Sequence, residues 1–192
     1  MKKITKTKPD FFATFLEENK PQEWKDISPI REQIRLHILK IEQNYQCAYT
    51  GISLKGNNDD SHIDHYKKQN MFPEERFNYN NMFVSTNNEK FGAKYKDKHI
   101  TEAEYNLLIN PVLEDPNEYF EYYSSGEIYS KNNSEKGKKT IELLQLNHRF
   151  LTKRRKDKIK IFNSYKNMYN IEELIEYIKE FEGMIRNLYN NI

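Results

Sequence analysis

Apolar residues recur at helical spacing in two long stretches, one near each end of the chain. Residues 29–45 are expected to form the first helix, because Ser28 and Pro29 suit its N-cap and first turn. Its apolar stripe consists of Ile30, Ile34, Ile38 and Ile41. Near the other end, Asn170 begins a capping box. The apolar stripe behind it predicts one final amphipathic helix through positions 171, 174, 175, 178, 181, 185 and 188.

The middle of the chain has shorter patterns. Gly51 and the polar run 56–60 separate two extended pieces, and residues 82–84 form a third β-prone run. Residues 87–98 are polar and suit a helix, although Gly92 weakens it. A short helix opening at Thr101, a brief strand at 126–129 and helices at 134–146 and 150–168 complete the prediction. The expected fold class is α+β, mostly helical, with a small β element in the middle.

Composition makes this a folded chain with modest charge. Only 36% of its 192 residues are hydrophobic, but 14 Tyr and 11 Phe supply apolar area for a core and argue against disorder. The net charge of +2 excludes a general polyelectrolyte binder, so a nucleic-acid surface must come from local clusters. We expect a single compact unit made of an N-terminal arm and helix (1–46), a central polar core (47–98) and a C-terminal helical region (99–192).

Cysteine usage and hydropathy set the expected compartment. Cys47 is the sole cysteine, which excludes an intrachain disulfide and a zinc site made of several thiolates. The basic start of the chain has no apolar stretch behind it, and no window reaches the length of a membrane span. We therefore expect a cytoplasmic protein that does not bind membranes.

One polar cluster in the central core has the residue types of a one-metal nuclease. Asp64 is a natural ligand for a hard divalent cation, and the imidazole of His65 titrates in the range needed of a general base. The Asn81 amide suits a role in holding the loop and orienting that imidazole. Asn88 is positioned to complete the metal site from the next helix, and Asn87 is an equally placed competitor. Spacing alone also allows ordinary surface or capping roles for Asp64 and His65.

Several motifs in order give the chain a resemblance to a known family. They include residues 46–49 (Gln-Cys-Ala-Tyr), 62–66 (His-Ile-Asp-His-Tyr), 79–82 (Tyr-Asn-Asn-Met), 108–111 (Leu-Ile-Asn-Pro) and 142–147 (Glu-Leu-Leu-Gln-Leu-Asn). With this pattern the chain resembles the HNH endonucleases of Septu-type and retron-associated anti-phage systems. The resemblance implies that residues 47–98 form an HNH ββα-metal core with flanking N- and C-terminal helices.

Carried over to this chain, the resemblance implies His65 as general base, Asp64 as metal ligand and Asn81 as the middle residue of the motif, with Mg²⁺ or Mn²⁺ as the cofactor. Two departures stand out. The family's zinc-binding cysteines are reduced to Cys47, which argues against a structural zinc, since positions 50, 86 and 91 hold Thr, Thr and Phe. Ala93 stands where the family tends to place a histidine near Gly92, so Asn88 or Asn87 would replace that ligand or the site is weakened.

Basic residues near the motif are the expected contacts for phosphates. Candidates for nucleic-acid binding are His62, Lys67, Lys68, Lys94 and Lys96. The resemblance further implies an ABC/SMC-like ATPase subunit as partner, with a retron reverse transcriptase and its msDNA as a further one. The N-terminal arm and the last helix are the surfaces nominated for the ATPase.

The predicted function is metal-dependent cleavage of phosphodiester bonds in anti-phage defence, with DNA favoured over RNA as substrate. One competing hypothesis is an HNH-fold scaffold or binding subunit with weakened catalysis. The other is a toxin-like subunit that cleaves RNA with the same residues.

Overall fold

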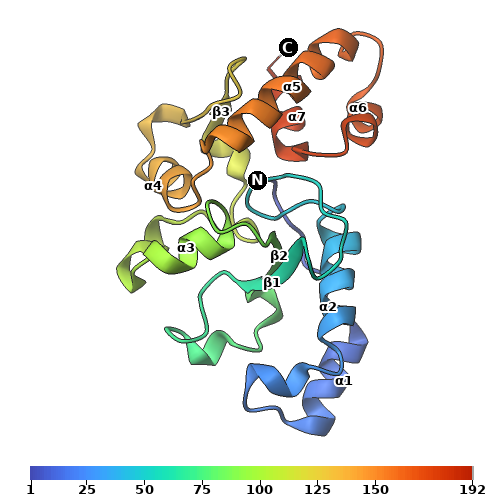
Figure 1. The fold of residues 1–192 in the computed structure, drawn as a ribbon, viewed down its shortest axis with the longest axis vertical. Helices are drawn as coiled ribbons and strands as arrows, with labels where there is room; N and C mark the ends of the chain where they lie inside the picture. Colours follow the sequence, from blue (N-terminus) through green and yellow to red (C-terminus); the bar gives the residue numbers. More distant parts are fainter. Residues whose placement is uncertain (192) are drawn as a thin grey trace.

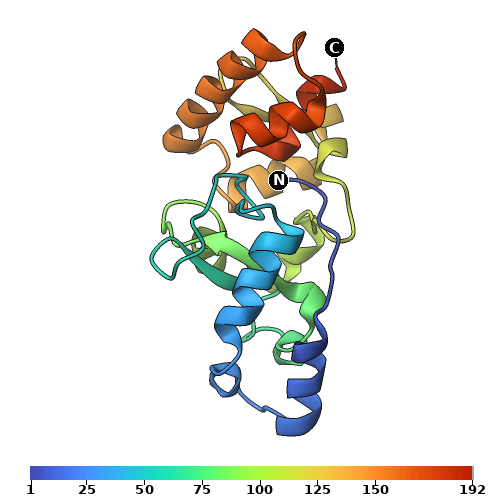
Figure 2. The same ribbon diagram turned by 90° about the vertical axis from the view of Figure 1, so that its right-hand side faces the viewer.

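The structure is a computed structural model that describes residues 1–191. The molecule is elongated, with three parts along its long axis (Figure 1). Helix α1 (Asp10–Asn19) lies at one end, and the hairpin of β1 (Ser61–His65) and β2 (Met82–Thr86) lies in the middle. The C-terminal helices occupy the other end. Figure 2 shows that the first residues run from the middle of the molecule to α1, which ties the N-terminus to the central part.

The N-terminal arm is anchored by a few buried apolar residues. Ile4 is buried, and its amide donates to the Pro111 carbonyl at 2.8 Å, so the arm crosses to the C-terminal region. Pro9 precedes α1 as its N-cap, and η1 (Trp24–Ile27) closes the arm with a capping box between Glu23 and Asp26. Pro9 and Pro21 flank α1 and limit its length, because proline is disfavoured inside a helix.

The helix expected over residues 29–45 is present but changes its winding. Helix α2 (Arg31–His37) continues directly into a π-helical turn, η2 (Ile38–Glu42). Ile34 and Ile38 are fully buried, whereas Ile41 is 64% exposed. The expectation that Ile41 belongs to the apolar stripe was wrong, because the wider π turn rotates it away from the core and buries Leu39 instead.

The central part has the expected strand–loop–strand–helix order. Strands β1 and β2 are antiparallel, with Asp64 opposite Phe83 and His65 opposite Met82. Two short turns, η3 (Pro73–Glu75) and η4 (Tyr79–Asn81), lie in the connection, and α3 (Ala93–His99) follows β2. The helix expected from residue 87 begins only at Ala93, because Gly92 adopts a positive φ of 77° and its amide bonds the Leu144 carbonyl. Asn87 and Asn88 therefore lie in a loop before α3.

The C-terminal region contains a second, shorter hairpin and four helices. The capping box at Thr101 opens η5 (Glu102–Leu107), as predicted. The remaining elements are η6 (Pro116–Glu118), β3 (Phe120–Tyr122), β4 (Ile128–Ser130), η7 (Lys131–Asn133), α4 (Glu135–Leu143), α5 (Arg149–Tyr165), α6 (Ile171–Ile178) and α7 (Glu182–Tyr189). The fold is therefore α+β with two small antiparallel sheets, and within residues 1–191 no helix is both long and apolar enough to cross a membrane.

The single final helix expected from Asn170 is in fact two helices. Its capping box with Glu173 is present, but Lys179 and Phe181 adopt left-handed φ angles of 60° and 56°. The amide of Phe181 donates to the Gly51 carbonyl at 2.6 Å, and the carboxylate of Glu180 binds Arg154 on α5. These contacts with distant segments bend the chain between α6 and α7, which the local apolar pattern does not reveal.

Candidate functional site

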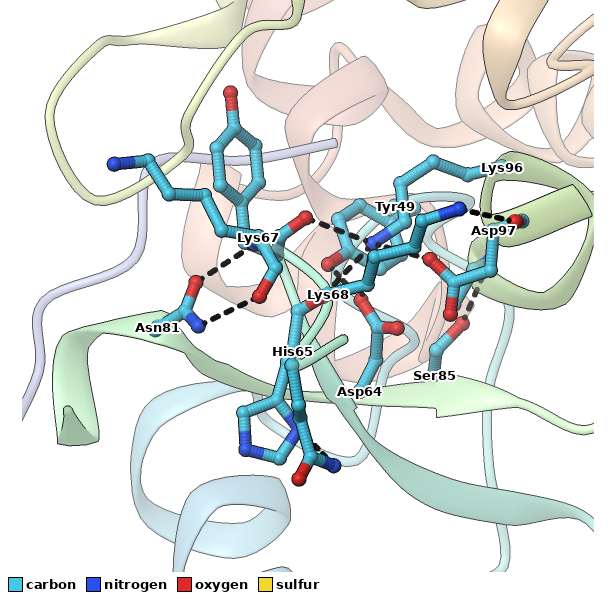
Figure 3. A network of polar contacts seen from close by, with 12 residues as sticks. Tyr49, Asp64, His65, Lys67, Lys68, Asn81, Ser85, Lys96 and Asp97 are labelled. Carbon is cyan, nitrogen blue, oxygen red and sulfur yellow. Dashed lines mark hydrogen bonds and ion pairs between the residues drawn. The ribbon is translucent and has the colours of Figure 1, made fainter. Parts of the chain in front are cut away.

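Asp64 and His65 leave β1 on opposite sides, as successive strand residues do. The Asp64 carboxylate is buried and accepts hydrogen bonds from the Tyr49 hydroxyl and from the Lys96 ammonium of α3. The His65 ring instead packs against Trp24, with ring centroids 4.4 Å apart. Figure 3 shows the imidazole pointing away from the Asp64–Lys96 pair. The expected convergence of the two side chains on one cation is not present.

The Lys96 ammonium lies in a cage of four oxygen atoms. Its Nζ donates to Asp64 Oδ2 at 2.9 Å and to the carbonyls of His65 and Tyr66 at 3.0 Å. Asp97 Oδ1 is 3.3 Å away, and the Lys96 side chain has no exposed surface. Figure 3 shows these groups meeting between β1 and α3. We call this cluster of Tyr49, Asp64, Lys96 and Asp97 the lysine cage.

The positive charge of Lys96 compensates the two carboxylates of the lysine cage. Burial alone lowers the pKa of Lys96, but the carboxylates of Asp64 and Asp97 outweigh it and raise that pKa above its ordinary value. Burial, followed by repulsion from Asp64, raises the pKa of Asp97 to about 6. Lys96 is therefore a cation at neutral pH and provides the positive charge next to Asp64.

Both ring nitrogens of His65 are engaged. Nε2 lies 2.9 Å from the Arg76 carbonyl and so carries the proton, while Nδ1 lies 3.3 Å from the Gln69 amide nitrogen. Only 5% of the residue is exposed, and burial lowers its pKa. The imidazole is thus neutral and enclosed, a state that suits a structural contact better than proton transfer with a polynucleotide.

Asn81 holds the loop between the strands, as expected. Its Oδ1 accepts from the Lys67 amide at 2.8 Å, and its Nδ2 donates to the carbonyls of Lys67 and Glu75. Figure 3 shows this two-way clamp on Lys67. Within residues 1–191, no hydrogen bond joins the Asn81 side chain to His65. The predicted role of Asn81 in orienting the imidazole therefore has no direct contact to support it.

The asparagines proposed as the second metal ligand lie at the other end of the hairpin. Asn87 comes directly after β2, whose last residue, Thr86, pairs with Ser61 at the start of β1. The Asn87 Oδ1 lies 2.9 Å from His62 Nδ1. Asn88 Oδ1 accepts from the Lys90 amide. Both asparagines lie beyond the end of β2, whereas the residue opposite Asp64 is Phe83, well inside the strand. The structure does not bring Asn88 to Asp64 as predicted.

The predicted phosphate contacts differ in exposure. The Lys67 and Lys94 side chains are 38% and 35% exposed, and Lys94 pairs with Glu89. Lys68 Nζ donates to the Asp97 carbonyl at 2.9 Å. The prediction that Lys96 contacts nucleic acid is wrong, because its ammonium is enclosed in the lysine cage where no polymer can reach it.

Asp97 and Tyr49 were not among the predicted site residues. Asp97 lies four positions after the buried Ala93, and this spacing marks the helix face toward β1.

The arrangement does not fit a divalent cation. Mg²⁺ requires near-octahedral oxygen ligands at about 2.0–2.1 Å, and the position between the two carboxylates is filled by an ammonium with contacts of 2.9–3.3 Å. Among residues 1–191, no group of three or more His, Cys, Asp or Glu side chains is placed to hold a metal ion. The chemistry available here is charge compensation across the β1–α3 interface.

Of the positions where the resemblance would place zinc-binding cysteines, Thr50 and Thr86 both lie next to Gly92. Cys47 Sγ lies 3.5 Å from Ser85 Oγ, and a Cβ built on Gly92 would lie 3.5 and 3.6 Å from the methyl groups of Thr86 and Thr50. Phe91 is also buried, and its ring packs against the rings of His148 and Phe150. Hydroxyl, methyl and aromatic groups fill this part of the core.

Comparison with known proteins gives one informative relationship. The chain is 33% identical over 84 residues to Septu protein PtuA from Bacillus mycoides (strain KBAB4). The match covers 44% of this chain but only 12% of that protein. No protein-family model matches the chain. The similarity supports the Septu part of the resemblance, whereas the nuclease-subunit part stays a prediction.

Proposed function

We propose that this chain is a subunit of a Septu-type anti-phage defence system that uses an HNH-like hairpin as a scaffold and not for metal-dependent cleavage. The similarity to a Septu protein supports the defence role. The single observation that carries the scaffold role is the ammonium of Lys96, fully buried against Asp64 at the position expected for the metal.

An internal ammonium changes what the hairpin can do. A hydrated divalent ion keeps open positions for a phosphoryl oxygen, whereas Lys96 directs all its contacts to protein oxygens. The resulting ion pair joins β1 to α3 and needs no metal. The hairpin is then a rigid platform between the N-terminal arm and the C-terminal helices, suited to binding a larger partner such as an ABC/SMC-like ATPase subunit.

Metal-dependent cleavage is the second candidate function. It is favoured by the order β1–loop–β2–α3, by His65 at the end of β1, and by two carboxylates, Asp64 and Asp97, that face each other across the lysine cage. In this candidate Lys96 would withdraw on activation and the carboxylates would hold Mg²⁺ or Mn²⁺. DNA is then the favoured substrate, with RNA cleavage as the toxin-like variant.

A nuclease assay in two settings separates the candidates. The purified chain, alone and with its co-expressed partner subunits, is incubated with plasmid DNA and tRNA in Mg²⁺ or Mn²⁺. The proposal expects equal products from wild type and His65→Ala, and full protection from phage in cells carrying the His65→Ala system. Cleavage that the wild type performs and that a folded His65→Ala variant has lost would favour the nuclease instead. The matched control is His99→Ala, at an exposed histidine of α3 that has no assigned role in the site.

A further inference from the structure

A cleft lies beside the start of β1. It has a volume of about 500 Å³, within the range of small-ligand sites, and is formed by η1, α2 and the first half of β1. The residues that matter here are Trp24, Arg31, Arg35, Ser61, His62 and Asn87. None of the four lysine-cage residues lines it, so the cleft is distinct from the lysine cage.

Two guanidinium groups in this cleft have buried donors without partners. Arg35 is 3% exposed; its Nη1 donates to Ser61 Oγ at 3.0 Å, but its Nη2 has no hydrogen-bond partner. The Glu32 carboxylate forms an ion pair with that Nη2 at 3.6 Å, a distance longer than a hydrogen bond, and is 69% exposed. Arg31 donates from Nη2 to the Trp24 carbonyl at 3.0 Å and leaves Nε unpaired.

Unpaired donors of this kind are unusual in a folded protein. A buried polar group without a partner is destabilising, and each one calls for an explanation. Two arginines lining one cleft with free N–H groups suit an oxyanion, because the guanidinium fork matches the oxygen spacing of a phosphate. Glu32, the one carboxylate in the lining, pairs with Arg35 and is largely exposed, so two guanidinium groups against one carboxylate leave the cleft with net positive charge.

Neighbouring groups narrow the ligand further. His62 Nδ1 contacts Asn87 Oδ1 at 2.9 Å and therefore carries the proton, which leaves Nε2 as an acceptor for a hydroxyl group. Trp24 provides an apolar wall next to the arginines. Oxyanion donors, a hydroxyl acceptor and an aromatic wall together match the phosphate, sugar and base of one nucleotide.

We propose that this cleft binds a single nucleotide through its phosphate group, with Arg31 and Arg35 as the phosphate contacts. The nucleotide is either free or the 5′-phosphorylated end of a nucleic acid, since both present the same group. This inference rests on Arg31 and Arg35, neither of which belongs to the lysine cage or to the predicted nuclease residues, so it stands whether or not the hairpin cleaves.

Trp24 is the only tryptophan in the chain, so its fluorescence reports on the cleft directly. The full chain is titrated with AMP, adenosine, and a short oligonucleotide with or without a 5′-phosphate, and calorimetry is run in parallel in case the fluorescence is silent. We expect saturable binding of AMP or the 5′-phosphorylated oligonucleotide. Adenosine and the unphosphorylated oligonucleotide should bind at least tenfold more weakly. Which phosphorylated probe binds more tightly identifies the source of the nucleotide.

Substitutions test the assigned contacts. Arg31→Gln and Arg35→Gln should each weaken binding by about tenfold or more, while the exposed Arg149→Gln of α5 should leave it unchanged. Circular dichroism checks folding, and Arg31→Gln keeps the test valid if Arg35→Gln unfolds. The proposal is overturned if no phosphorylated probe binds by either method, if adenosine binds equally well, or if Arg31→Gln binds like the wild type.

Discussion

The chemistry of the central hairpin depends on which charge lies next to Asp64. A carboxylate buried this deeply requires a compensating cation, and Lys96 supplies one with no exposed surface of its own. The same carboxylate with an open neighbouring position would attract a metal ion. One side chain of α3 thus separates a scaffold from a candidate metal site.

Removing that charge should strongly destabilise the fold. We expect Lys96→Met to lower the free energy of unfolding by about 3–5 kcal/mol, because it leaves the buried Asp64 carboxylate without a compensating cation. The double variant Asp64→Asn/Lys96→Met should recover a substantial part of this loss. Urea unfolding measures both, and Lys94→Met, whose Glu89 partner is exposed, should change stability by less than about 0.5 kcal/mol. Equal effects at positions 94 and 96 would contradict the buried pair.

Buried histidines should make the fold sensitive to mild acid. Burial lowers the pKa of both His62 and His65, so below pH 6.5 the unfolded chain binds protons that the folded chain does not. Their contribution to stability is therefore complete above pH 6.5 and is lost as the pH falls toward the lowered values. Urea midpoints at pH 7, 6 and 5 should fall less for His62→Gln/His65→Gln than for wild type. Asp97 has the opposite effect on stability. Its raised pKa stabilises the folded state as the pH falls from 6 to 4, and this contribution is the same in the wild type and in the double variant.

At the level of elements, short contacts between backbones determine how the second hairpin docks. Gly126 has a φ of 87°, and its carbonyl accepts from Arg155 Nε of α5 at 2.6 Å. A Cβ built on Gly126 would lie 2.1 Å from the Thr152 carbonyl oxygen, which is backbone and cannot move aside alone. The turn between β3 and β4 therefore fits against α5 only with glycine.

Gly126→Ala should consequently be far more harmful than Gly56→Ala. Gly56→Ala is the matched control, because Gly56 also has a positive φ (81°) but its added Cβ would meet only the flexible end of Leu39, at 3.1 Å. We expect roughly 1–2 kcal/mol of destabilisation for Gly56→Ala from backbone strain, and a clearly larger loss for Gly126→Ala. Thermal unfolding compares the two, and similar melting temperatures would show that the hairpin can move away from α5.

Elements with local signals were predictable, and those shaped by distant contacts were not. The capping boxes at Thr101 and Asn170 each open the helix expected of them, because a capping box involves only neighbouring residues. The division of the final helix required Gly51, more than a hundred positions away, to bind the Phe181 amide. The exposure of Ile41 likewise follows from a π turn that the spacing of apolar residues does not predict.

For the whole molecule, metal dependence is the property that separates the two candidate functions. With Lys96 in place, 10 mM Mg²⁺ or EDTA should leave the melting temperature of the wild type unchanged. A ligand that binds only the folded state raises stability with its concentration, so an increase would reveal a metal site. Lys96→Ala leaves Asp64 and Asp97 facing a vacant space and should be stabilised by Mg²⁺. Stabilisation of the wild type to the same extent would favour the nuclease.

The sequence by itself determined the α+β class, the order strand–loop–strand–helix in the middle of the chain, and the loop-clamping role of Asn81. These depend on residue types and on neighbours within a few positions. Only the tertiary structure decided that Lys96 faces Asp64, that His65 is enclosed by Trp24, and that Arg31 and Arg35 line one cleft with His62. Burial and charge pairing arise where distant segments pack together, so spacing along the chain carries too little information to assign them.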